Sequence, residues 1–250
     1  MLRFFLISGT AFFAGAISLV SQIVGLRIVT RELSASELTV ASVLVCALCG
    51  LTLGAFTAGR IADQKQHEPP PEDPTSKKQK FGALTLANVL LVLAAFAVLM
   101  LALWGRDFAG WLGQFGGQSL HVFSFLLATV FPINVLLGGI VPVLTKAAIA
   151  KRTDDVQTAF GWIYAWETFG AAVGSSAVVF FAIPMVGTGN SLLVTAIVVL
   201  VWAAIGVLLA GKQKSPEPTH LEKPAETLNP PTAYSVGLRW LLLFLSLIHI

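Results

Sequence analysis

Residues 81–104 read FGALTLANVLLVLAAFAVLMLALW, and none of them is charged. A helix needs about 20 mostly apolar residues to cross the hydrocarbon core of a bilayer, so this stretch predicts a transmembrane helix. Over all 250 residues, hydrophobic types make up 56% and charged types 12%, whereas an ordinary soluble domain has roughly 25% charged residues. The composition therefore predicts an integral membrane protein.

Five more stretches of the same kind lie on either side of residues 81–104. The predicted membrane helices cover residues 4–29, 38–61, 81–104, 120–149, 159–183 and 191–210. A seventh apolar run begins near Tyr234 and is cut off at Ile250. We therefore expect an all-α integral membrane fold, with a bundle of six complete transmembrane helices in a domain over residues 1–210 and a truncated seventh over residues 234–250.

Proline and charge mark other parts of the chain. Residues 120–149 contain Pro132 and Pro142, so a kink or break is expected there, because proline interrupts the hydrogen bonding of a helix. Prolines and charges also fill residues 64–80 and 211–233. This composition predicts a disordered loop and a proline-rich linker.

The distribution of Lys and Arg predicts the orientation of the chain. Cytoplasmic loops of membrane proteins retain an excess of these residues. Arg27, Arg31 and Arg106 lie on one predicted side, and the other thirteen of the sixteen Lys and Arg residues lie on the opposite side. We therefore expect the N-terminus, the 64–80 loop and the 211–233 linker in the cytoplasm.

Several functional classes find no support in the sequence. The basic residues lie in short loops rather than on a solvated domain, which argues against nucleic acid as a partner. Cys46 and Cys49 are one helical turn apart, but no second pair or nearby histidine completes a metal site. Because no glycine-rich phosphate-binding motif is present either, we predict no catalytic residue, metal or cofactor within this chain.

Glu167 is the first candidate for a functional residue. A carboxyl group at membrane depth is costly, so it is a functional candidate by default, and it can accept a proton, bind a cationic amine or pair with a basic neighbour. Tyr164 and Gly170 are spaced three residues from it on either side. This spacing predicts one helical face, packed inward, that carries all three residues.

Tyr164 is a further candidate for binding a substrate because of its place beside Glu167. Gln22, Arg27 and Asn134 are candidates by the same argument about polar groups in membranes. The alternative for Gln22 and Asn134 is a hydrogen bond between neighbouring helices. Arg27 can instead extend its charged end to the membrane surface. The sequence leaves these alternatives open.

Small residues predict where the helices touch. In lipid, helices associate by close backbone approach, and the spacing G-x-x-x-G is typical of such contacts. Gly50 and Gly54 have this spacing in residues 38–61, and Gly170 and Gly174 have it in residues 159–183. We expect both pairs to face other helices.

Four motifs together resemble the membrane region of bacterial spermidine-synthase-like proteins. The run GWIYAWETFGAAVG at 161–174, with Pro184 and Gly187 downstream, resembles the family pattern G-x-L-Y-A-x-N-T-x-G-A-x-x-G. The run at 50–63 ends in the loop motif Gly59, Arg60 and Asp63, which is also similar to a loop of major-facilitator transporters.

The other two motifs are shorter. They are QIVGLR at 22–27 and GGIVP at 138–142. The chain departs from the family pattern at Glu167, where the family usually has Asn, and at Gly25, where it usually has Trp. The resemblance covers about residues 5–210.

The resemblance implies a location and a function. It implies a multi-pass protein of the bacterial cytoplasmic membrane, with the lipid bilayer and a polyamine as partners. In the family, a further C-terminal domain resembles polyamine aminopropyltransferases, for which decarboxylated S-adenosylmethionine is the co-substrate. That domain is missing from this chain, so we expect the membrane domain of such a protein, without catalytic activity of its own.

Two alternatives remain open. The six helices can form half of a major-facilitator-like transporter that moves polyamines or other cations past Glu167. They can also form a passive anchor for a soluble domain.

Overall fold

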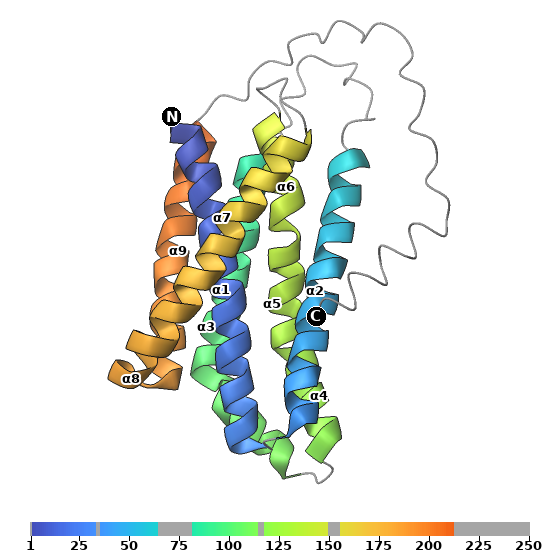
Figure 1. Cartoon of the computed structure of the whole chain (residues 1–250), viewed down its shortest axis with the longest axis vertical. Helices are drawn as coiled ribbons and strands as arrows, with labels where there is room; N and C mark the ends of the chain where they lie inside the picture. The colour runs from blue at the N-terminus through green and yellow to red at the C-terminus, as the bar shows by residue number, and fades with distance from the viewer. Residues whose placement is uncertain (1, 34–35, 65–81, 115–117, 150–155, 213–250) are drawn as a thin grey trace, which may run out of the picture. The chain divides into compact units, whose positions relative to one another are not determined.

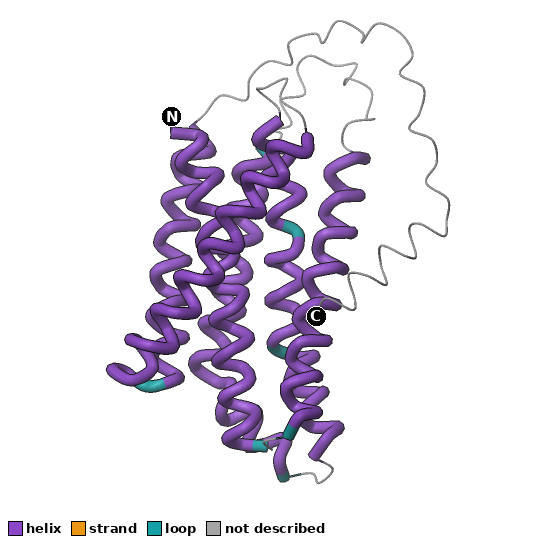
Figure 2. Tube along the Cα trace, in the orientation of Figure 1, coloured by secondary structure: helices purple, strands orange, loops and turns teal. Residues whose placement is uncertain are grey.

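The computed structural model describes residues 2–33, 36–64, 82–114, 118–149 and 156–212, and these residues are helical apart from short turns (Figures 1 and 2). The α-helices are α1 (Leu2–Glu32), α2 (Glu37–Gln64), α3 (Ala83–Gly113), α4 (Gln118–Ala128), α5 (Val130–Gly138), α6 (Ile140–Ile149), α7 (Val156–Ala177), α8 (Ile183–Val186) and α9 (Thr188–Lys212). A π-helix, η1 (Val178–Ala182), separates α7 from α8. Within the described residues, six helical stretches are long and apolar enough to cross a membrane.

These stretches coincide with the six predicted segments, but their ends differ. The largest difference is in α3, which was predicted to end at Trp104 and continues to Gly113. Arg106 and Asp107 are exposed on its last turns, whereas Ala109 is buried. Hydropathy therefore placed the end too early, because a helix continues past an apolar run when only one of its faces has to be buried.

Three other predictions fall mostly outside the described residues. The 64–80 loop overlaps them only at Gln64, the last residue of α2, and the 211–233 linker only at the end of α9. The seventh segment, 234–250, lies entirely outside them.

The predicted kink in residues 120–149 is present as two interruptions. Helical structure breaks at Thr129 and again at Gly139, each three residues before a proline, Pro132 and Pro142. Proline lacks the N–H group that would bond the carbonyl four residues earlier, and its ring clashes with that carbonyl. One membrane-length segment is therefore built from the three short helices α4, α5 and α6.

A third proline, Pro184, lies where the helical stretch that begins with α7 is interrupted. Pro184 lies just after η1 and within α8, and a π-helical turn is a common way to accommodate such a disruption. Gly187 then adopts a φ of +85°, a conformation that residues with a side chain rarely adopt, and the chain reverses into α9.

Helix α1 lies at the centre of the bundle. It packs against α7, α9 and α3, and its buried face includes Ala14, Ile17 and Val20. Helix α2 packs mainly against α4, α5 and α6. In contrast, most of the surface of α7 is left uncovered by other helices (Figure 1). Helices α2 and α7 pack mainly on different neighbours and make few direct contacts with each other.

Candidate functional site

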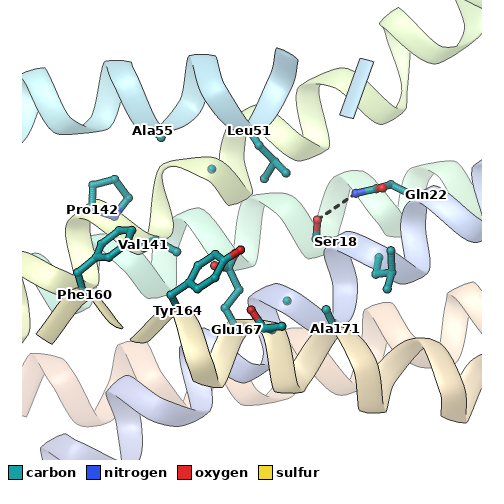
Figure 3. A pocket seen from close by; sticks show the side chains of 14 residues that line it. Ser18, Gln22, Leu51, Ala55, Val141, Pro142, Phe160, Tyr164, Glu167 and Ala171 are labelled. Carbon is teal, nitrogen blue, oxygen red and sulfur yellow. Dashed lines mark hydrogen bonds between the residues drawn. The ribbon is translucent and has the colours of Figure 1, made fainter. Parts of the chain in front are cut away.

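A pocket of about 380 Å³ lies between α1, α2, the α5–α6 junction and α7. Figure 3 shows α2 on one side of it and α7 on the other, with side chains from both directed into the space between. Its lining is mostly apolar or small and includes Leu19, Leu51, Ala55, Val141 and Pro142. The volume is near the lower end of the range for small-molecule sites, which is about 300–1,000 Å³.

Glu167 contributes the carboxyl group of the pocket. It lies eleven residues into α7, which corresponds to about 16 Å along the helix axis at 1.5 Å per residue. That distance is about half the thickness of a hydrocarbon core of roughly 30 Å. The ion pairs found within the described residues both involve Glu32. None of them involves Glu167.

Tyr164 and Phe160 extend the same side of α7 along the pocket, about one and two turns before Glu167, respectively (Figure 3). The two aromatic side chains stack, with ring centroids 6.2 Å apart and planes 7° from parallel. Tyr164 is 56% exposed and Phe160 48%. They therefore form the outer part of the pocket wall rather than its floor.

Three polar side chains form a hydrogen-bonded group at the inner end of the pocket. The Oδ1 atom of Asn134 accepts hydrogen bonds from Ser18 Oγ at 3.1 Å and from Gln22 Nε2 at 3.3 Å. Asn134 Nδ2 donates to the carbonyl oxygen of Val130 at 2.8 Å. Ser18 and Gln22 line the pocket themselves. The group joins α1 to α5 and presents amide chemistry beside the apolar wall.

Glycines allow the walls of the pocket to come close together. A Cβ atom on Gly15 would collide with the backbone carbonyl oxygen of Glu167, and a Cβ atom on Gly170 would collide with that of Phe12. These positions need glycine because the backbones of α1 and α7 are in direct contact. This backbone contact determines the position of Glu167 relative to α1.

The remaining predicted packing glycines also lie at helix contacts. A Cβ atom on Gly174 would meet Ala16 on α1 at 2.6 Å. Added Cβ atoms on Gly50 and Gly54 would collide with the backbone of α5, at Phe131 and Val135. The two G-x-x-x-G pairs therefore mark the α7–α1 and α2–α5 interfaces.

The prediction that Tyr164, Glu167 and Gly170 share one inward face is wrong. Gly170 is buried against α1, whereas Tyr164 is exposed and lines the open side of the pocket. Three residues advance a helix by about 300°, so each step of three drifts by about 60° and two steps by about 120°. Glu167 lies between the two directions.

Other predicted site residues lie away from the pocket. Arg27 is exposed near the end of α1 and does not line it. In the loop motif, Gly59 has no neighbour within 4 Å of an added Cβ atom, and the Arg60 guanidinium lies 4.3 Å from the centre of the Phe56 ring. Asp63 is in the last turn of α2.

Sequence reasoning missed Ser18, Gly15 and Thr168, which also line the pocket. A usable signal existed for Gly15, because Ala11 lies four residues before it and gives the small-residue spacing of a contact face. Nothing in the sequence distinguished Ser18 from the other serines of the chain.

Neither cysteine forms a disulfide: Cys46 is buried and Cys49 is exposed. Among the described residues, no group of three His, Cys, Asp or Glu side chains is placed to hold a metal ion. Comparison with models of protein families, with curated proteins and with solved structures found no match.

Proposed function

We propose that this chain is the membrane domain of a spermidine-synthase-like protein and that its pocket binds an organic amine. The observation that carries the proposal is Glu167, a carboxyl group without a basic partner among the described residues, in a pocket at membrane depth. Placing a charged carboxylate there is costly unless a proton or a cation compensates it. A protonated amine is the organic group that supplies such a charge.

The neighbouring residues support an amine rather than a bare metal ion. Gln22 adds an amide at the pocket's inner end, and Tyr164 presents an aromatic ring at its outer part. Amide oxygens accept hydrogen bonds from an ammonium group, and aromatic faces attract organic cations. The wall between them is apolar and suits the carbon chain of an amine.

The distribution of charge supports a cytoplasmic N-terminus in a bacterial cytoplasmic membrane. Arg3, at the start of α1, donates a hydrogen bond of 2.5 Å to the carbonyl oxygen of Ala147, near the end of α6. At the far end of α1, Glu32 contacts Arg31 at 3.6 Å and Arg106 at 3.5 Å. Arg31 and Arg106, two of the three cations that the sequence assigns to that side, thus contact one acidic residue, and the sequence assigns the other thirteen Lys and Arg residues to the opposite side.

Half of a facilitator-type transporter for cations is the second candidate, since a site between helices near the middle of a membrane is where transporters bind their substrates. A passive anchor needs no such site. In the first candidate, the resemblance assigns aminopropyl transfer, with decarboxylated S-adenosylmethionine, to a separate soluble domain, and the membrane domain contributes amine binding.

Equilibrium binding of radiolabelled putrescine and spermidine to the chain reconstituted in nanodiscs tests the proposal. We expect saturable binding that Glu167→Gln weakens at least tenfold. Glu37→Gln is the matched control, because Glu37 is exposed at the start of α2. Binding that is absent, or equal in wild type and Glu167→Gln, would leave the passive anchor as the better description. Uptake of the bound amine into proteoliposomes would favour the transporter.

A further inference from the structure

The pocket lies between α2 and α7, and the gap between these two helices is its opening. Its two flanking helices belong to different packing groups, since α2 packs mainly on α4, α5 and α6, whereas α7 packs on α1 and α6. Phe160 and Tyr164, on the α7 side of the opening, are about half exposed. If the described helices span a membrane as they stand, these exposed side chains place the opening next to the acyl chains of the lipid.

The interior of the pocket offers one compensating charge. Glu167 is its only acidic residue, and no Lys, Arg, His or Asp lines it within the described residues. Ser18 Oγ and Gln22 Nε2 are hydrogen-bonded to Asn134 Oδ1 and to each other, and the amide oxygen of Gln22 can accept a hydrogen bond but carries no charge. Leu51, Ala55 and the aromatic pair on α7 line the same pocket as Glu167 and form its apolar wall.

We infer that the ligand is an amphiphilic monoamine, which enters from the bilayer through the gap between α2 and α7. Its ammonium group pairs with Glu167, and its alkyl chain lies along the apolar wall and extends into the lipid. This inference rests on the proposed amine site and specifies the ligand class. A second ammonium group on the chain would lie in apolar surroundings with no counter-charge, and this is costly.

Two amines with the same carbon chain test the ligand class. Octylamine carries one ammonium group and 1,8-diaminooctane carries two. The binding of each amine is measured with wild-type protein and with Glu167→Gln in nanodiscs, and uptake by protein-free nanodiscs is subtracted from both. The difference between wild type and Glu167→Gln is the binding that depends on Glu167. We expect octylamine to bind at least tenfold more tightly than the diamine.

The route of entry is tested by narrowing the gap. Ala55 lines the pocket on α2 (Figure 3). Ala41 is exposed on the same helix and does not line the pocket. We expect Ala55→Leu to weaken octylamine binding at least tenfold and Ala41→Leu to change it less than twofold. The comparison of the two amines uses the unmodified pocket, so it stands even if Ala55→Leu does not fold.

The other outcomes overturn the ligand class, the amine site or the route of entry, respectively. Glu167-dependent binding that is equal or tighter for the diamine overturns the monoamine but keeps the proposed amine site. Loss of Glu167-dependent binding for both probes, and for putrescine and spermidine, overturns the proposed function as well. Efficient crosslinking of two copies through Tyr164→Cys in proteoliposomes shows that a second copy covers the opening, which overturns entry from the lipid.

Discussion

Gly170→Ala tests whether direct backbone contact between α1 and α7 supports the bundle. A Cβ atom at this position would lie 2.7 Å from the Cα atom of Phe12 and 2.6 Å from its carbonyl carbon, and closer still to the carbonyl oxygen. Ordinary contact distances between such atoms are about 3.5–4.0 Å. The helices therefore have to separate by roughly 1 Å to accommodate the added methyl group, given those distances.

The size of the effect follows from two opposing contributions. Forcing an extra carbon into a tightly packed contact costs about 1–3 kcal/mol. Alanine is favoured over glycine in a helix by up to about 1 kcal/mol. We therefore expect Gly170→Ala to lower the free energy of unfolding by about 1–2 kcal/mol.

Gly161→Ala is the matched control because it makes the same chemical change on the same helix. Gly161 is exposed, and no atom lies within 4 Å of an added Cβ atom there. We expect this variant to be neutral or to gain up to about 1 kcal/mol from helix propensity. Unfolding by titration with sodium dodecyl sulfate in mixed micelles, followed by circular dichroism, compares both variants with wild type. Equal midpoints for Gly170→Ala and Gly161→Ala would refute the role given to the α1–α7 contact.

Three further predictions use the same unfolding assay. Gly206→Ala should cost about 1–2 kcal/mol after the gain in helix propensity, because its Cβ atom would collide with the buried Asn88 amide. In an Asn88→Ala background Gly206→Ala should cost clearly less, and an equal cost there would contradict this reason. Asn134→Leu should lower the free energy of unfolding by about 1–2 kcal/mol, since hydrogen bonds between membrane helices average about 0.6 kcal/mol each and Asn134 accepts two from α1. No loss of stability would show that these hydrogen bonds do not help to hold α1 and α5 together. Glu32→Gln should lower the free energy of unfolding by less than about 1 kcal/mol, because its partner Arg106 is largely exposed. Salt at about 0.5 M should reduce this difference between variant and wild type, since salt screens exposed charges. A larger loss that does not depend on salt would contradict a surface ion pair.

Most of the helical architecture was predictable from local sequence. The six apolar segments were located correctly to within a few residues, apart from the end of α3, and the prolines of the 120–149 segment indicated where it breaks. These features depend on the length of an apolar run or on the geometry of one residue. The membrane orientation and the family resemblance remain predictions.

The candidate site was predictable only in part. Glu167 and Gln22 were identified because polar groups at membrane depth are rare, and Tyr164 because it lies three residues from Glu167. The structure brings all three to one pocket. Arg27 met the same criterion and lies elsewhere. The criterion says that a residue is unusual, but it contains no information about which helix faces it.

The sequence by itself determined that this chain forms apolar helices of membrane length, because the cost of exposing polar backbone in lipid depends on local composition. Only the tertiary structure decided that Gln22 bonds to Asn134, 112 residues away, and that Gly15 lies against the backbone of Glu167. Such contacts depend on how far each helix is rotated about its axis and how closely two backbones approach. Periodicity within one segment does not specify either quantity.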